Sequence, residues 1–247
     1  FTADLCLLLK TSGCIAISGG IEVASDRLLK LIDKGISIEQ VSKVNNHFTQ
    51  SGIMVHTYLM YGYPTQTTQE TIDSLEVVRQ LFEEGIIHSG FWHQFALTAH
   101  SPIGKNPEKF NIKINTESVG TFANNDLEFT DLTGTRHEKF SEGLRKSLFN
   151  YMHGICFENS LQSWFDFKIP KTTHSPFLIK SFIKRKSFQE IQPHHKVYWL
   201  GGNVKLITNK TVKKGKKAEE TVLRIYHVNE TVDISCTISV ANWFKKY

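Results

Sequence analysis

Two charged residues lie where a ligand-binding carboxylate and a cation are expected to meet. Glu22 follows a short apolar run, residues 14–19, and two glycines. At the tip of a strand its carboxylate can accept hydrogen bonds from the hydroxyls or the amine of a ligand, although a solvated loop acid has the same pattern. Lys34 closes the next short helix, where its ammonium either complements the helix dipole or folds back over the same pocket. The pair is therefore a candidate binding site.

Histidine and aromatic side chains alternate along two further strand-like runs. One face of residues 53–61 has more polar capacity than the other, and we assign it to the lumen of a barrel. This face consists of Met54, His56, Tyr58 and Met60. In the run 89–99, His93 and Phe95 share one face. His56 and His93 are then expected to approach each other across adjacent strands.

The sequence has no strong metal, phosphate or nucleophile motif. His88 and His100 fall on the face opposite His93 in an alternating strand, so a hydrogen-bonded pocket histidine is favoured over a metal ligand, and no metal site is predicted. The stretch SGGIEVAS lacks the spacing of either nucleotide-binding fingerprint. No G-x-S-x-G elbow is present, and no nucleophile is paired with a base.

The surrounding sequence alternates between strand and helix patterns. Ser25 and Ser37 are expected to cap two helices, and Thr67 or Thr68 a third. The apolar run at 14–19 fits a strand buried on both faces. The expected strands are 14–19, 53–61 and 89–99, and the expected helices lie before residue 14, at 25–35, at 37–51 and at 68–85. Such alternation implies parallel strands with crossover helices, in a doubly wound sheet or part of a (β/α) barrel, with ligands at the carboxyl ends of the strands.

Three regions are expected along the chain. Residues 1–105 form an α/β region of about three βα units, 106–193 a mixed, mainly helical connecting region, and 194–247 a small antiparallel β-rich region. In this last region the lysine-rich run 213–217 is interpreted as a turn between strands. Helices are expected at about 137–152, near 157–164 and near 176–190.

Composition restricts the class of protein. Of 247 residues, 40% are hydrophobic and 21% are charged, as in a globular protein with a core. No apolar run reaches about 18 residues, so no membrane span is predicted. The net charge of +5 is modest and no stripe of basic and aromatic residues is present, which argues against nucleic acid as a partner. The four cysteines are scattered, as expected for free thiols in a reducing cytoplasm.

Two stretches together resemble the radical SAM enzymes, and look most like the branch that often carries an N-terminal cobalamin-binding domain. The stretch GCIAISGGIEVASDRLLKLIDKG resembles the run G-x-E-x-x-S-x-x-x-L-x-x-x-x-K-G that follows the fourth strand of that family; the matching residues are Gly20, Glu22, Ser25, Leu29, Lys34 and Gly35. The stretch GIMVHTYLMYGYPTQTTQETIDSL resembles the fifth strand and its G-x-P-x-E-T turn. Gly62, Pro64 and Thr67 match that turn, whereas Gln66 replaces the usual acid and Thr65 the usual Gly.

The resemblance covers about residues 1–105 and implies a partial (β/α) barrel. S-adenosylmethionine would lie across the strand tips, bound to a [4Fe–4S] cluster through its amino and carboxylate groups. By the same resemblance, Glu22 and Lys34 contact the ribose or methionyl part, Ser25 belongs to the same binding motif, and Tyr58 faces the ribose from the fifth strand. Gly62 and Pro64 would shape the wall near the adenine, and His93 and Phe95 would lie near the adenine or the substrate.

One departure from the family concerns the cluster itself. The family holds it with three cysteines spaced C-x-x-x-C-x-x-C after the first strand, and no such triplet occurs here. Cys6 and Cys14 have neither the spacing nor the position. The chain is therefore expected to be the C-terminal half of a longer enzyme, inactive alone, with the strand at 14–19 left as an open edge for self-association.

Three functions are compatible with these patterns. The first is the C-terminal half of a radical SAM enzyme, whose parent would cleave S-adenosylmethionine reductively to a 5′-deoxyadenosyl radical and abstract hydrogen from an unidentified substrate. Its cofactors would be S-adenosylmethionine and [4Fe–4S], with cobalamin as a possible addition through a further domain. The second is a non-catalytic βα scaffold for binding or assembly. The third is a metal-dependent hydrolase barrel, for which Glu22, His56 and His93 are the candidate ligands.

Overall fold

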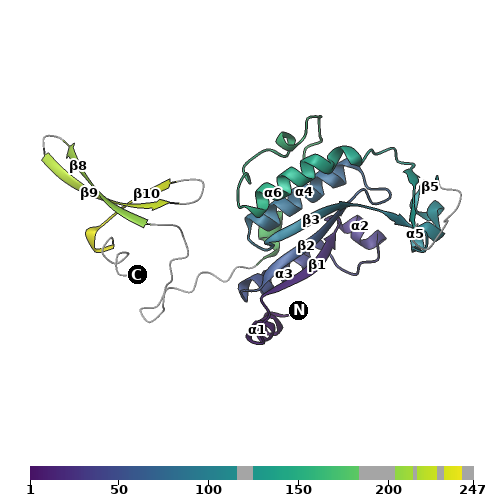
Figure 1. The fold of residues 1–247 in the computed structure, drawn as a ribbon, viewed down its shortest axis with the longest axis horizontal. Coiled ribbons are helices and arrows are strands. Elements are labelled where there is room, and N and C mark those ends of the chain that lie inside the picture. The colour runs from purple at the N-terminus through teal and green to yellow at the C-terminus, as the bar shows by residue number, and fades with distance from the viewer. Residues whose placement is uncertain (116–124, 184–203, 214–215, 227–230, 241–247) are drawn as a thin grey trace. The chain divides into compact units, whose positions relative to one another are not determined.

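The computed structural model describes residues 1–115, 125–183, 204–213, 216–226 and 231–240 (Figure 1). The chain divides into two compact units, Phe1–Arg185 and Lys186–Tyr247. Within the described residues, no helix has the length and apolar character needed to cross a membrane.

The first unit is built on a three-stranded parallel sheet. Its strands are β1 (Ala16–Glu22), β2 (Met54–Tyr61) and β3 (Ser89–Gln94), in the order β1-β2-β3. The helices of this region are α1 (Ala3–Thr11), α2 (Asp26–Leu31), α3 (Ile38–Gln50) and α4 (Thr68–Glu83). The prediction of an α/β fold with parallel strands and crossover helices is confirmed. Closure of the sheet into a barrel is not seen among the described residues.

Local sequence explains where these helices begin. The hydroxyls of Ser25, Ser37 and Thr67 accept hydrogen bonds from the first turns of α2, α3 and α4. Ser37 with Gln40, and Thr67 with Glu70, form complete capping boxes, in which the second side chain reaches back to the cap backbone. The caps predicted at Ser25 and Ser37 are confirmed, and Thr67 caps the third helix.

Among the described residues, helices cover one face of the sheet and leave the other open (Figure 1). Val55, Leu59 and Tyr61 of β2 point into the core formed with α3, α4 and α6 (Ser141–Met152). On the opposite face, Tyr58 is 48% exposed and Phe91 is 59% exposed. The period-two alternation expected for β2 is therefore present, and its more polar face is the uncovered one.

Two strand predictions require correction. The strand expected at 14–19 to be buried on both faces is β1, Ala16–Glu22, and Ala16, Ser18 and Gly19 are exposed. It is an edge strand with one neighbour among the described strands. Its small glycine and alanine residues therefore do not indicate burial on both faces. The strand expected at 89–99 is divided, because β4 (Leu97–Thr98) leaves the sheet and pairs with β6 (Asp126–Leu127).

Short elements connect the sheet to α6. These are α5 (Pro102–Lys105), η1 (Pro107–Phe110), β5 (Ile112–Ile114), β7 (Phe129–Asp131) and η2 (Glu138–Phe140), with β5 paired to β7. The helix predicted at 137–152 is confirmed as η2 followed by α6. Near 157–164 the structure has only a 3₁₀ turn, η3 (Leu161–Trp164), and near 176–190 it has α7 (Leu178–Phe182); residues after 183 in that prediction lie outside the described part.

The second unit contains an antiparallel sheet in the order β10-β9-β8, formed by β8 (Val204–Lys213), β9 (Lys216–Tyr226) and β10 (Thr231–Cys236). The predicted small β region is confirmed in these strands, and the lysine-rich run spans the β8–β9 connection. Arg224 and Asp233, which face each other across β9 and β10, form an ion pair at 2.7 Å. The first strand expected in this region, HKVYWLGG at residues 195–202, lies outside the described residues.

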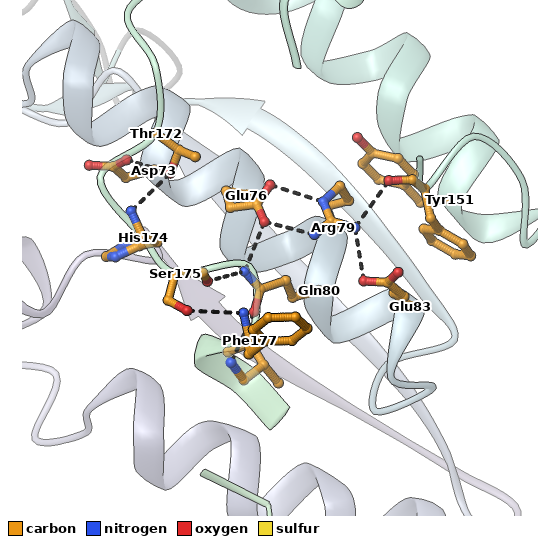
Figure 2. Close-up of polar contacts among 12 residues, drawn as sticks. Asp73, Glu76, Arg79, Gln80, Glu83, Tyr151, Thr172, His174, Ser175 and Phe177 are labelled. Carbon is orange, nitrogen blue, oxygen red and sulfur yellow. Dashed lines mark hydrogen bonds and ion pairs between the residues drawn. The ribbon is translucent and has the colours of Figure 1, made fainter. Parts of the chain in front are cut away.

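Helix α4 is the most enclosed helix of the first unit, and it buries polar side chains (Figure 2). Arg79 donates to Glu76 at 2.7 Å and to Glu83 at 2.8 Å, and also to the carbonyl of Phe157. Gln80 Nε2 donates to Glu76 Oε1 at 2.8 Å. The ionised groups are therefore hydrogen-bonded to each other, as buried charges must be.

The segment of residues 171–179 lies across α4 and is tied to it by hydrogen bonds (Figure 2). Asp73 accepts from Thr172 Oγ1 at 2.8 Å, and from the backbone N–H and hydroxyl of Thr173 at 2.7 and 2.8 Å. Gln80 donates to the carbonyl of Ser175 and accepts from the N–H of Ile179. Burial opposes ionisation of Asp73, but the hydrogen bonds outweigh it and lower the pKa of its carboxyl. We call residues 171–179 the strap.

Replacement of Asp73 by alanine should destabilise the first unit by about 1–3 kcal/mol, because three half-buried hydrogen bonds from Thr172 and Thr173 lose one shared, buried acceptor. Urea unfolding followed by circular dichroism measures this loss. The control is Glu39→Ala, which removes an exposed ion pair with Lys43 and should cost about 0.5 kcal/mol or less. Equal small losses in both variants would show that the strap does not depend on Asp73.

Candidate functional site

Glu22 is held at the end of β1 by an irregularity in strand pairing. Gly20 pairs with Tyr58 and Glu22 with Leu59, so Ile21 is an extra residue on β1. The backbone of Glu22 has φ 58°, a left-handed conformation that costs an L-residue about 1–2 kcal/mol. Strain of this kind is common at ligand-binding positions. The surrounding structure therefore imposes the position of this carboxylate.

Lys34 folds back toward Glu22, the second of the two positions considered from the sequence. Its Nζ donates to Glu22 Oε1 at 2.8 Å, and the two side chains remain 34% and 22% exposed. Asp33 and Gly35, both with positive φ, bend the chain on either side of Lys34. A pair this exposed contributes about 1 kcal/mol or less to stability. Its main effect is to fix the direction of both side chains.

The Glu22–Lys34 pair borders a cavity of about 540 Å³ at the carboxyl ends of the strands. This size suits a small molecule. Other residues lining this cavity include Met60, Tyr63, Phe95 and Phe110. Tyr63 and Phe95 meet edge to face at 5.1 Å, and burial raises the pKa of the Tyr63 phenol to about 12. The cavity therefore combines aromatic surface with a carboxylate and an ammonium at its rim.

The amide of Gln66 closes the turn after β2. Gln66 is fully buried, and its Oε1 accepts from the N–H groups of Gly62 at 2.6 Å and Tyr63 at 3.2 Å. One amide oxygen thus performs the acceptor role available to a carboxylate. Its Nε2 has no hydrogen-bond partner within the described part of the chain.

Thr65, which stands at the position that is usually glycine in the turn motif described above, has a left-handed backbone conformation. Its φ is 68°, a strained value for a β-branched residue. Contacts from two other elements hold it there: Arg27 Nη2 donates to the Thr65 carbonyl at 2.9 Å, and the Thr65 N–H donates to Asp131 Oδ2 at 3.0 Å. The turn is therefore fixed by tertiary contacts in addition to its own sequence.

The structure brings only some of the predicted cofactor residues to the Glu22 cavity. Glu22, Lys34 and Phe95 line it, whereas Ser25, Tyr58, Gly62, Pro64 and His93 are absent from its lining. Ser25 caps α2 and its Oγ donates to Glu70 at 3.2 Å. Tyr58 lies on the open sheet face, edge to face with His56, and Pro64 is buried in the turn.

The expected approach of His56 and His93 is wrong. Parallel register places His56 opposite Ser89, to which its Nδ1 is hydrogen-bonded at 2.8 Å, and His93 opposite Met60. The two histidines are therefore four residues apart along the strand direction, about 13 Å. Within the residues described, no group of three His, Cys, Asp or Glu side chains is placed to hold a metal ion.

His137 is a buried residue near the turn that the sequence did not indicate. It is 5% exposed, and a Cβ built on Gly62 would lie 3.2 Å from His137 Cβ. Neither ring nitrogen has a hydrogen-bond partner among the described residues. Burial lowers the pKa of the imidazole, and the nearby carboxylates of Asp131 and Glu138 only partly oppose this. No strand or helix periodicity marks the position, because His137 immediately precedes the 3₁₀ turn η2.

No protein-family model matches the chain, and no similar curated protein is found.

Replacement of Thr65 by glycine should leave the free energy of unfolding unchanged or raise it by up to about 1 kcal/mol. Relief of the left-handed strain offsets the greater flexibility of glycine in the unfolded chain. Thr133→Gly, in an exposed turn without positive φ, should instead lose about 0.5–1 kcal/mol. Urea denaturation compares the two variants; a larger loss at Thr65 than at Thr133 would contradict strain at Thr65.

His137 should make the protein less stable as the pH falls below about 7. Its folded pKa is lower than the unfolded value of about 6.5, so the unfolded chain binds the proton first, and stability present above that pH is lost on acidification. In His137→Leu this loss between pH 7 and 5 should be smaller, although His88, whose pKa burial also lowers, still contributes. Melting temperatures against pH test this, with exposed His100→Leu as the control.

Proposed function

We propose that this chain supplies the adenosyl-binding side of a radical SAM enzyme. The observation that carries the proposal is the Glu22–Lys34 pair at the rim of the 540 Å³ cavity, at the carboxyl ends of parallel strands. Ligands of α/β sheets bind at this edge. By the resemblance, both residues contact the ribose or methionyl part of S-adenosylmethionine, and their hydrogen bond keeps them together at one cavity.

The donor set of the cavity fits a nucleoside. The Glu22 carboxylate can accept from ribose hydroxyls, because only its Oε1 is hydrogen-bonded to Lys34. Tyr63, Phe95 and Phe110 provide flat apolar surface for a purine ring. The protonated Tyr63 phenol can donate to a ring nitrogen or to a carboxylate. These residues bind and orient the adenosyl group.

The open face of the sheet fits the lumen of a partial (β/α) barrel. Tyr58, His93 and Phe91 lie on this face, which the helices leave uncovered. In the proposal, Tyr58 extends toward the ribose, His93 toward the substrate, and Gly62 with Pro64 forms the wall beyond Phe95. The missing part of the barrel would pair with the free edge of β1 and enclose this face.

The cluster ligands are assigned to a part of the enzyme outside residues 1–247. Cys6 is fully buried in α1, and the sequence has no C-x-x-x-C-x-x-C run. When bound, S-adenosylmethionine and a [4Fe–4S] cluster supply one-electron reductive cleavage and a 5′-deoxyadenosyl radical for hydrogen abstraction. The parent enzyme is proposed to be cytoplasmic, with cobalamin as an additional cofactor if a further domain binds it.

A second candidate, a non-catalytic scaffold for binding or assembly, is favoured by the edge of β1. In the described residues this edge has no strand partner, and Ile15, the residue directly before β1, is 70% exposed; Leu7 (57%) and Leu8 (61%) of α1 are also exposed. Unpaired backbone groups next to apolar surface form a ready pairing site. Another copy of this chain could occupy this edge. The metal-dependent hydrolase has no supporting cluster among the described residues.

Binding of 5′-methylthioadenosine tests the adenosyl site without requiring a cluster. Isothermal titration should detect binding to the 247-residue chain. Glu22→Gln should weaken it about tenfold or more, the value of a hydrogen bond to a charged group. Glu39→Gln, on the exposed Glu39–Lys43 pair, is the matched control and should bind like the wild type.

A folded chain that does not bind 5′-methylthioadenosine would contradict the adenosyl site and favour the scaffold. Stoichiometric zinc or manganese in the purified protein would instead support the hydrolase. The gene upstream of Phe1 tests the enzyme assignment separately. A C-x-x-x-C-x-x-C run within about a hundred upstream residues, the reach of about three βα units, supports it. An initiator methionine immediately before Phe1 would exclude catalysis by this protein.

A further inference from the structure

A second cavity adjoins the cavity bordered by Glu22 and Lys34, which we call the adenosyl cavity, and Phe95 lines both. It measures about 380 Å³, a volume suited to a small ligand or one end of a larger one. Its wall is formed by Gly62 directly after β2, the end of β3 with the residues that follow it, the β6–β7 segment and the residues before α6. The proposed adenosyl function does not use this cavity.

Carboxylates dominate the charge of this second cavity. Asp126, Glu128, Asp131 and Glu138 line it, and no lysine or arginine is among its described lining residues. Arg136 and Lys139 flank the wall in sequence, but the Lys139 ammonium lies over the rings of Phe140 and Phe167, 5.1 and 4.8 Å from their centroids. Such a concentration of negative charge in a concave surface favours a cation.

Asp131 is fixed in position by the protein itself. Its Oδ2 accepts from the N–H of Thr65 at 3.0 Å and its Oδ1 from the N–H of Thr133 at 2.8 Å. Each carboxylate oxygen has a further lone pair, so these bonds orient the group without exhausting its capacity. A fixed carboxylate needs little reorganisation when a ligand binds.

His137 provides an observation independent of the acidic residues. It lines the cavity, is 5% exposed, and has two buried ring nitrogens without partners in the described residues. A buried polar group left unpaired costs about 1–3 kcal/mol, so the protein gains when a ligand or its bound water completes these bonds. Because burial favours the neutral imidazole, His137 does not repel a cation and has a lone pair to accept from one.

From this arrangement we infer that the second cavity binds a positively charged amine or guanidinium group of a small molecule. Asp131 and Glu138 neutralise its charge, and His137 accepts one N–H. Phe95 and Phe129, edge to face at 5.8 Å, pack against the carbon chain of the ligand. The inference stands independently of the adenosyl proposal. If both hold, Phe95 separates the cation from the adenosyl group, and the ligand is a cationic substrate.

The n-butylguanidinium ion and the neutral, nearly isosteric n-butylurea separate charge recognition from shape. Two-dimensional NMR titration of the 247-residue chain in about 0.15 M salt, where surface charges are largely screened, measures both. Saturable binding of n-butylguanidinium is expected, with shifts of the His137 ring resonances and n-butylurea at least tenfold weaker. Equal binding of the two probes, or no binding to the folded chain, overturns the inference.

A pair of matched variants distinguishes the cavity from general electrostatics. Asp126→Asn with Glu138→Gln removes two exposed cavity carboxylates and should weaken n-butylguanidinium binding at least fivefold. Glu108→Gln with Glu142→Gln makes the same change in net charge at exposed positions outside the cavity and should have little effect. Equal weakening by both pairs overturns the inference. Binding of 5′-methylthioadenosine, measured on the same samples, reports separately on the adenosyl cavity.

Discussion

Parallel hydrogen bonding between β1, β2 and β3 is the constraint from which the rest of the first unit follows. Parallel strands end at the same edge, so Glu22, Gly62 and Phe95, distant in the sequence, meet around two adjoining cavities. The crossover helices α3 and α4 pack on one face, and in the described part of the chain the middle of the other face is uncovered at Tyr58 and Phe91. The strand register also keeps His56 away from His93. Both side chains lie on the same face of the sheet, but their positions along the strands differ by four residues.

The cavities rest on polar contacts between neighbouring elements. Glu70 closes the cap of α4, binds Arg27 from α2 at 2.7 Å and accepts from Ser25, so α2 and α4 are tied at the turn between cavity and helix. On α4 itself, Glu76, Arg79 and Gln80 satisfy each other away from water. Buried ion pairs of this kind add little net stability, but they penalise any arrangement that separates the partners. The positions of α2 and α4 behind the turn at residues 62–66 are therefore well defined, although the individual contacts are modest in energy.

Patterns local in sequence predicted much of this unit. Alternation in β2, helical spacing in α3 and α4, and the caps at Ser25, Ser37 and Thr67 depend on neighbours within a few residues, so the sequence alone indicates them. The prediction that β1 is buried on both faces was wrong. Burial of a strand depends on the elements that lie beside it, and small residues occur in both central and edge strands. The sequence indicated that Lys34 could reach Glu22, because both residues flank the same short helix. By contrast, Asp131 contacts Thr65 from 66 residues away, and His137 has no local signature. Such contacts depend on how distant segments pack, and the local patterns of a single sequence do not predict this packing.

The strap also sets an order of events during synthesis of the chain. Asp73 and its donor, the backbone N–H of Thr173, are 100 residues apart in the sequence. Gln80 and the N–H of Ile179, from which it accepts a hydrogen bond, are 99 residues apart. At about 5–20 residues per second, α4 emerges from the ribosome some 5–20 s before its last hydrogen-bond partners emerge. Until then the carboxylates and amides of α4 that the strap will cover must be hydrated or bound by a chaperone. The βα units can therefore pair early, but the nascent unit closes only when the strap arrives.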